Sequence, residues 1–241
     1  MMHASRAVDI PGVALNPNAR VEIKKIGHEQ QPVFIVDQAL INVEAMVAFA
    51  AEHTTFGPPP STSRYPGRVA PLPASYMPNI LAALRRPLES VFGYVAGPRP
   101  TSFGFYGLAT VLTADLMPDQ VIPHADATQP NAYASVHFLS AHDYGGTAFY
   151  RHKATGLEVV SPAKSQASYQ QRNAELEAYK GSPHSKLQAL YEEIAYIEPV
   201  ANRLILYRAG QLHSAKMAGV DTLPDDPRTG RLTANLFVNI G

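Results

Sequence analysis

The sequence has no cysteine among its 241 residues, and this absence excludes disulfide bonds, thiolate zinc sites and cysteine nucleophiles. It also lacks an excess of either charge, because lysine plus arginine and aspartate plus glutamate both number 20. A phosphate backbone would need a basic excess, so we expect no nucleic-acid partner. No run of about eighteen apolar residues occurs, and Met1 to Pro11 lacks a basic region followed by an apolar stretch. We therefore expect a cytoplasmic protein that does not bind a membrane.

What is present predicts one domain over residues 1–241, with strands and supporting helices in its first part, residues 21–100. Asp37 is a good N-cap for the first of these helices, because its side chain can accept from free backbone N–H groups. A Pro-rich loop over residues 57–73 is expected to be irregular. The elements expected in this part are strands over 21–26 and 32–36 and helices over 39–53 and 76–92.

From residue 102 onward the pattern changes to strands, which are rich in aromatic and β-branched residues. The exception is an insertion over about residues 165–197, whose apolar stripe predicts two helices broken at Gly181 and Pro183. Helices first and strands later indicate an α+β protein with a double-stranded β-helix (jelly roll, cupin-like) core over 102–241, flanking N-terminal helices and a helical insertion. The expected strands cover 103–113, 133–139, 147–151, 203–208 and 231–240.

Three residues in this second part are candidate metal ligands. His124 and Asp126 are two positions apart, so in an extended segment both side chains leave the same face, and Pro123 favours that conformation. His213 ends a short strand-like run far downstream. Two histidines and one carboxylate leave one side of an octahedral ion open, which is why Fe(II) oxygenases use this set. The alternative for the first pair is a loop carboxylate that hydrogen-bonds its neighbouring imidazole.

The order of motifs around these residues resembles that of the Fe(II)/2-oxoglutarate-dependent dioxygenases, particularly the branch that includes the prolyl hydroxylases. The resemblance runs from about residue 103 to 240, and the helical insertion departs from it. In that family a His-x-Asp motif is followed by a strand, a Gly-Gly-x-Thr-like turn, a strand that ends in the distal histidine, and a basic residue on the next strand. Here the turn is Gly145-Gly146 and the basic residue is Arg231.

The resemblance implies that His124, Asp126 and His213 bind Fe(II) and act in catalysis. It also implies that Arg231 binds the distal carboxylate of the cosubstrate 2-oxoglutarate, for which its planar guanidinium is suited. Thr233 shares a strand face with Arg231 and is expected to bind the same carboxylate. Tyr106 is a further candidate for the cosubstrate site, with a core aromatic as the alternative.

The implied activity is hydroxylation of a carbon of a small-molecule or peptide substrate. The sequence is compatible with a homodimer. The Pro-rich loop and the insertion are expected to shape the entrance, since substrate choice depends on variable loops. Three alternatives remain at this point. They are a cupin-like metalloprotein of another reaction class, a non-catalytic jelly-roll binding module, and a scaffold that binds partners through the helical insertion.

Overall fold

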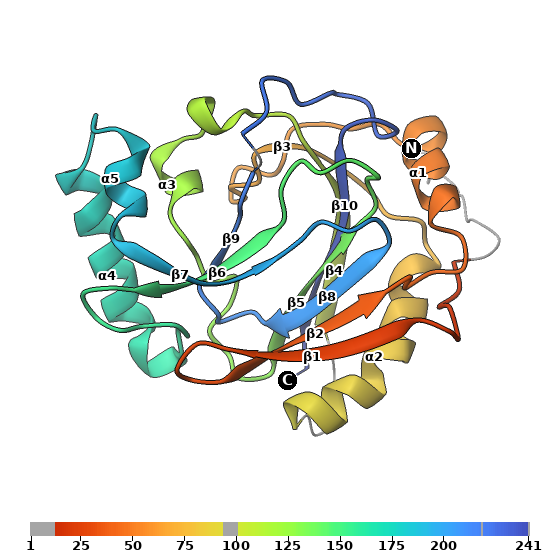
Figure 1. Cartoon of the computed structure of the whole chain (residues 1–241), viewed down its shortest axis with the longest axis horizontal. Coiled ribbons are helices and arrows are strands. Elements are labelled where there is room, and N and C mark those ends of the chain that lie inside the picture. Colours follow the sequence, from red (N-terminus) through yellow and green to blue (C-terminus); the bar gives the residue numbers. More distant parts are fainter. Residues whose placement is uncertain (1–12, 94–100, 218, 241) are drawn as a thin grey trace, which may run out of the picture.

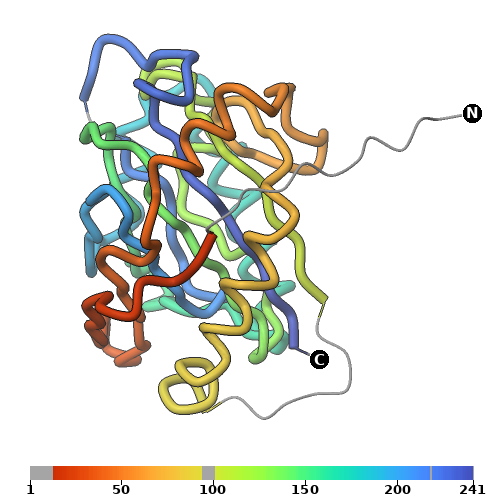
Figure 2. The backbone as a smooth tube through the Cα atoms, turned by 90° about the vertical axis from the view of Figure 1, so that its right-hand side faces the viewer, coloured from red at the N-terminus to blue at the C-terminus, as the bar shows by residue number. Residues whose placement is uncertain are grey.

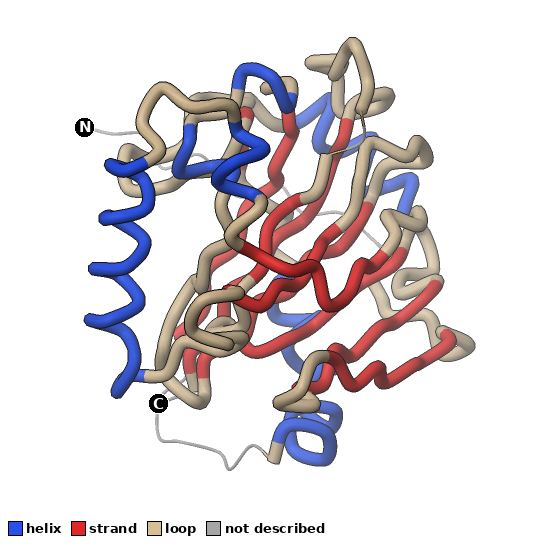
Figure 3. The backbone as a smooth tube through the Cα atoms, turned by 60° about the vertical axis from the view of Figure 1, so that its left-hand side comes forward, coloured by secondary structure: helices blue, strands red, loops and turns tan. Residues whose placement is uncertain are grey.

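The computed structural model describes residues 13–93, 101–217 and 219–240, and the expectation about residues 1–11 lies outside them. Strands fill the centre of the molecule and helices lie at its periphery (Figure 3). All strand pairs within the described residues are antiparallel. The larger sheet has the order β1-β2-β8-β5-β10-β4-β3, and the smaller sheet has the order β7-β6-β9 (Figure 1). The strands are β1 Arg20–Ile26, β2 Gln31–Asp37, β3 Gly67–Ala70, β4 Thr101–Ala109, β5 Ala132–Phe138, β6 Thr147–His152, β7 Tyr191–Ile197, β8 Arg203–Arg208, β9 His213–Ala215 and β10 Arg231–Asn239.

The path of the chain between the two sheets defines the fold. A bridge between His124 and His213 adds the His124 segment to the edge of the smaller sheet, beside β9. The chain then runs from β4 in the larger sheet to the His124 segment, back to β5, across to β6 and β7, back to β8, across to β9 and back to β10. This alternation of eight segments between two sheets is a double-stranded β-helix, or jelly roll, and the predicted fold class is confirmed.

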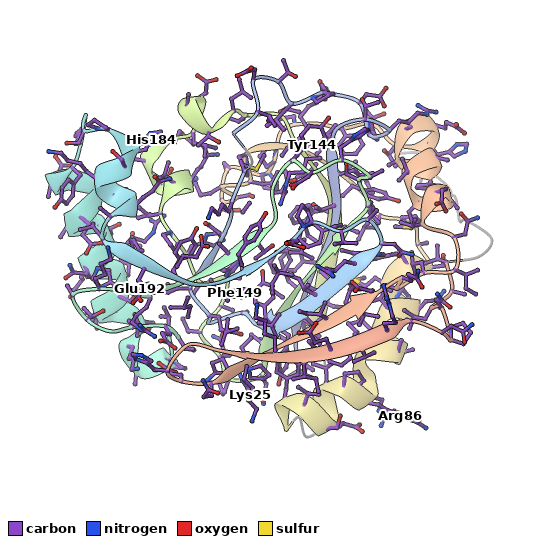
Figure 4. All side chains as sticks on the ribbon, viewed as in Figure 1. Lys25, Arg86, Tyr144, Phe149, His184 and Glu192 are labelled. Carbon is purple, nitrogen blue, oxygen red and sulfur yellow. The ribbon has the colours of Figure 1, made fainter. Side chains whose placement is uncertain are left out.

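Side chains on the inner faces of the two sheets form one core between them. Phe149 and Ile197 from the smaller sheet pack there against Ile205 and Tyr207 from the larger sheet. Phe149 lies near the centre of the molecule (Figure 4). This space between the sheets is the barrel interior, and the site described below lies in it.

Helices cover the outer face of the larger sheet. Figure 2 shows α1 Val43–His53 and α2 Tyr76–Phe92 together on the near side of the strands. Met46, Ile80 and Leu84 from these helices pack against alternate residues of the strands, such as Leu108 and Leu232. The predicted range of α2 is confirmed, because its apolar residues recur every three or four positions and Gly93 ends it in a left-handed conformation, φ 67°.

The predicted N-cap of the first helix is wrong. α1 begins at Val43, and the side chain of Asn42 caps it by accepting from the backbone N–H of Ala45 at 3.1 Å. Asp37 ends β2 instead, where its carboxylate pairs with Arg203 at 2.6 Å. The Asp37 carboxylate therefore pairs with an arginine that is distant in the sequence and does not cap a nearby helix.

The predicted all-helical insertion is also wrong in its last part. α4 Pro162–Ala178 and α5 His184–Gln188 are helices at the outer side of the smaller sheet, but residues 191–197 form strand β7 (Figure 1). Tyr191, Ala195 and Ile197 face the core in this strand while Glu192 and Glu193 stay exposed, so burial overrides the helical spacing of the leucines before it. The Pro-rich loop is likewise not irregular throughout, because it contains β3.

Two shorter helices complete the described elements, the 3-10 helix Thr113–Asp115 and α3 Pro118–Val121. Among the helices of the described residues, none has both the length and the apolar character that crossing a membrane requires.

Candidate metal centre

Backbone pairing brings the three predicted metal ligands together. The N–H groups of His124 and His213 each donate to the carbonyl of the other at 2.9 Å. The N–H of Asp126 donates to the carbonyl of Ala209 at 2.8 Å. These bonds hold the His124 segment in extended conformation along β9, so residues almost ninety positions apart present their side chains side by side.

The side-chain atoms have the separations of ligands that share an ion. Nε2 of His124 lies 3.4 Å from one Asp126 carboxylate oxygen, and Nε2 of His213 lies 3.3 Å from the other. The potential ligand atoms of all three residues lie within 4.8 Å of one another. Two ligands at about 2.1 Å from an ion and at right angles to each other would be about 3.0 Å apart. One cation therefore fits between these groups after small side-chain rotations.

The surroundings of His213 leave the correct nitrogen available for a metal. Its Nδ1 lies 2.9 Å from the carbonyl oxygen of Gln211, which can only accept, so Nδ1 carries the proton and Nε2 presents a lone pair. On the side of the barrel interior, the ring contacts Tyr207 and Phe149, at centroid distances of 4.8 and 6.3 Å. His213 is 7% exposed, whereas the His124 side chain is 44% exposed. The site therefore has one closed side and one side open to solvent.

The charges within the group favour an ionised carboxylate. Burial raises the pKa of the Asp126 carboxyl, but His213 and His124 outweigh this effect and hold the pKa well below its usual value. Burial lowers the pKa of His213, but the charge of Asp126, its hydrogen bond and the carbonyl of Gln211 together raise this pKa above its usual value. An ionised carboxylate between two imidazoles is the form that a divalent cation requires.

Arg231 lies at the start of β10 with its side chain in the barrel interior. It is 4% exposed, its Nε donates to the carbonyl of Gly145 at 2.8 Å, and one terminal nitrogen donates to the carbonyl of Gly146 at 3.3 Å. It forms no ion pair with a described residue. A buried cation without a carboxylate is costly, and burial accordingly lowers the pKa of this guanidinium. Arg231 is therefore placed to bind an anion, and none of the described residues supplies one.

The Gly145-Gly146 turn places the carbonyls that orient Arg231. Gly145 has a φ of 98°, as expected for a tight turn, and a Cβ at Gly146 would lie 2.0 Å from the carbonyl oxygen of Ile197. Only glycine allows this approach to β7. Tyr144, directly before the turn, lies toward the top of Figure 4.

Tyr65, on the Pro-rich loop, is a site residue that the sequence interpretation missed. Its hydroxyl is buried next to the guanidinium of Arg231 and the hydroxyl of Thr233, yet it has no well-formed hydrogen bond. Burial raises the pKa of this phenol, although the charge of Arg231 acts in the opposite direction. The ring lies on Gly107, where a Cβ would be 2.4 Å from the phenol oxygen. A glycine in a strand opposite Thr233 was the available signal, because such a glycine often marks a close approach.

Thr233 shares the inner face of β10 with Arg231, as predicted. Its hydroxyl donates to the carbonyl of Gly107 at 3.3 Å and accepts from the side-chain amide of Asn235 at 3.0 Å. The hydroxyl is thus oriented by the chain beside Arg231 and Tyr65.

The prediction that Tyr106 contributes to the cosubstrate site is wrong. Tyr106 pairs with Ala234, so it lies on the face of the larger sheet opposite to that of Arg231 and Thr233. Its side chain is completely buried under α1, where the hydroxyl donates to the carbonyl of Met46 at 2.9 Å. The alternative interpretation, a core aromatic, is correct, because a shift of one position along a strand reverses the face.

Replacing Tyr106 with phenylalanine should therefore affect stability alone. Loss of the bond to Met46 is expected to lower the free energy of unfolding by about 1 kcal/mol, measured by urea denaturation. Titration with 2-oxoglutarate should give the same affinity as the wild type. A weaker affinity in the variant would mean that Tyr106 does act in the site.

Strand order and converging side chains together define a jelly-roll protein with a candidate site for one metal ion. The chain belongs to the family described as Family of unknown function (DUF6445), whose model matches residues 17–238. No curated protein is significantly similar to it. Since the family description names no activity, the resemblance to the prolyl hydroxylase branch stays a prediction.

Several solved structures are similar in fold at low identity. HygX from Streptomyces hygroscopicus, with nickel and 2-oxoglutarate bound, is 11% identical over 88% of this chain and 84% of its own, with a TM-score of 0.46. An N-substituted L-amino acid dioxygenase from Burkholderia ambifaria, in complex with α-ketoglutarate, is 9% identical over 91% and 93%, with a TM-score of 0.45. SnoN, an α-ketoglutarate-dependent epimerase from nogalamycin biosynthesis, is 11% identical over 88% and 80%, with a TM-score of 0.44. No residue role follows from similarities of this level.

Proposed function

We propose that this protein is a 2-oxoglutarate-dependent oxygenase with Fe(II) bound by His124, Asp126 and His213. The observation that carries the proposal is the pairing of two features in one barrel. Three potential metal ligands converge within 4.8 Å, and a buried arginine without a carboxylate partner extends into the same interior. The first feature alone fits many metalloproteins, whereas the second calls for an organic acid beside the metal.

The donor set fits Fe(II). Two imidazoles and one carboxylate are the ligands of non-haem iron oxygenases, and they leave positions on one side of an octahedral ion for other ligands. Asp126 is held ionised, and His213 is held in the tautomer that presents Nε2. The hydrogen bond from Nδ1 to Gln211 also fixes the plane of the ring, as outer partners of metal-bound histidines do.

The second group of residues fits the distal carboxylate of 2-oxoglutarate. Arg231 would offer the N–H groups that do not bind Gly145 and Gly146, and a carboxylate would neutralise its charge. The phenol of Tyr65, which has no well-formed bond, would donate to the same carboxylate. The hydroxyl of Thr233, which lies on the same face of β10 as Arg231, would be the third group at this carboxylate.

When both are bound, Fe(II) and 2-oxoglutarate supply the oxidising power for hydroxylation of a carbon by dioxygen, with release of carbon dioxide and succinate. The protein supplies position and exclusion of water. Phe138, Phe149 and Tyr207 surround the inner side of the site, where the Arg231 guanidinium lies 6.0 Å from the Phe138 ring centroid. The more exposed His124 lies on the side from which a substrate would approach.

The test is anaerobic addition of Fe(II) and then 2-oxoglutarate to the full chain. We expect a weak visible metal-to-ligand charge-transfer band, which requires that metal and cosubstrate bind together. Iron that binds without any band on addition of 2-oxoglutarate would contradict the proposal and favour a cupin-like metalloprotein of another reaction class. Failure to bind iron or nickel would favour a non-catalytic binding module.

A further inference from the structure

Helix α4 touches the smaller sheet near Glu175 and Leu176, and the rest of it covers a cavity. Glu175 is the one buried residue among its seventeen, so this helix has almost no apolar face of its own. Beneath it lies a cavity of about 710 Å³. Small-molecule sites typically measure about 300–1,000 Å³, and this cavity is of that size.

The cavity extends from α4 to the metal-ligand segment. Its lining includes Pro123, His124 and Ala125 as well as polar residues of α4. Leu157, Val160 and Leu212 provide an apolar wall. A molecule in this cavity would thus have an apolar surface to cover and would lie beside a candidate metal ligand.

The charged residues that line the cavity are all cations. Lys164 and Arg172 extend from α4, and no aspartate or glutamate belongs to the lining. Arg172 makes one hydrogen bond, from a terminal nitrogen to the backbone carbonyl of Asp119 at 2.8 Å. Its Nε is buried and has no partner, and neither cation forms an ion pair with a described residue. A guanidinium with a buried donor in this state favours an anionic ligand.

The buried carboxylate of α4, Glu175, does not supply that anion. Glu175 accepts from Gln171 at 2.6 Å, contacts a ring nitrogen of His152 at 2.7 Å and accepts from the hydroxyl of Tyr191 at 3.4 Å. One oxygen of Glu175 contacts both Gln171 and His152, the other accepts from Tyr191, and these contacts hold α4 against β6 and β7. Glu175 pairs with His152 and forms no ion pair with Arg172 or Lys164, so neither cation has a carboxylate partner among the described residues.

We propose that this cavity binds a small organic anion, with its acidic group on Arg172, assisted by Lys164, and its apolar part against Leu157, Val160 and Leu212. If the proposed oxygenase function holds, on which this further step rests, the ligand is the substrate, and its class is a carboxylic acid of small-molecule size. Arg172 is then a specificity-determining residue, and α4 is the element that selects the substrate.

The experiment compares an acid with its neutral amide. Fluorine NMR of 4-fluorophenylacetate and 4-fluorophenylacetamide is recorded with the full chain, without metal and without 2-oxoglutarate. The acid is expected to bind at least about tenfold more tightly than the amide, since a charge-assisted hydrogen bond is worth more than about 1.4 kcal/mol. R172Q should remove this preference, and K164Q should reduce it by a smaller factor.

R86Q is the matched control, because Arg86 is an exposed arginine of α2, remote from the cavity (Figure 4). It should keep the preference of the wild type. Equal binding of acid and amide, no binding of the acid, or an undiminished preference in R172Q with a native circular dichroism spectrum would each overturn the proposal. Because metal and cosubstrate are absent from this experiment, its outcome is independent of whether Fe(II) and 2-oxoglutarate bind.

Discussion

Replacement of Asp126 with alanine is expected to lower the affinity for Fe(II) at least about a hundredfold relative to the wild type. Loss of an outer partner of a metal ligand already costs about ten- to a hundredfold, and Asp126 is proposed as a ligand itself. It is also the only carboxylate of the described group that lies between the two imidazoles, at 3.4 and 3.3 Å. H213A should have an effect of the same size, because it removes the buried, tautomer-fixed donor.

Anaerobic titration with Fe(II), or with Ni(II) to avoid oxidation, measures this effect. D225A is a matched control, since Asp225 is half exposed and pairs with Arg68 at 2.6 Å away from the barrel interior. H184A is the matched control for H213A, because His184 lies on α5 at the outside of the molecule (Figure 4). Undiminished metal affinity in D126A or H213A would exclude the proposed site, whatever the result with 2-oxoglutarate.

The sequence was sufficient for the elements whose pattern is local. Helix α2 and strand β8 have their predicted bounds. The apolar period of α2 matches its buried face, and β8 is a continuous apolar run that is buried on both faces of the sheet. The three candidate ligands could also be selected from the sequence. His124 and Asp126 have an i, i+2 spacing, and His213 ends a strand-like run at the place that the resemblance to a known family implies. The bridge between His124 and His213 that brings them together is non-local and had to come from the structure.

Residues that depend on tertiary contacts were mispredicted or missed. Tyr106 and Gly107 are neighbours in β4, yet only Gly107 faces the barrel interior, because the face is set by the pairing of Gly107 with Thr233. Tyr65 reaches the site from a Pro-rich loop, where no periodicity indicates direction. That loop is fixed by Arg64, which binds Asp119, and by Gln120, which donates to the Arg64 carbonyl at 3.1 Å. Partners more than fifty residues apart in the chain leave no local pattern.

Replacement of Arg231 with alanine is expected to weaken 2-oxoglutarate binding by at least about thirtyfold and to leave metal affinity nearly unchanged. Truncation of one partner of a buried, hydrogen-bonded charge pair typically costs about 2–5 kcal/mol, and about 2 kcal/mol corresponds to thirtyfold. Calorimetric titration of the metal-loaded protein with 2-oxoglutarate measures the loss. Equal affinity in the variant would exclude the proposed role of Arg231.

Because Arg231 also holds the carbonyls of Gly145 and Gly146, its loss is expected to lower stability, so two milder variants keep the prediction testable. R231K retains the charge but not the planar fork, and should lie between the wild type and R231A in 2-oxoglutarate affinity. Y65F removes only a hydroxyl that has no well-formed bond in the protein, so no loss of stability is expected.

Y65F should nevertheless bind 2-oxoglutarate about fivefold more weakly, because a hydrogen bond of about 1 kcal/mol to the carboxylate is lost. Stability and affinity thus change independently in this variant. A structural role of Tyr65 would lower both the free energy of unfolding and the affinity, whereas a role in holding the cosubstrate lowers the affinity alone. Urea denaturation and calorimetry on the same sample separate the two, and an unchanged affinity in Y65F would remove Tyr65 from the site.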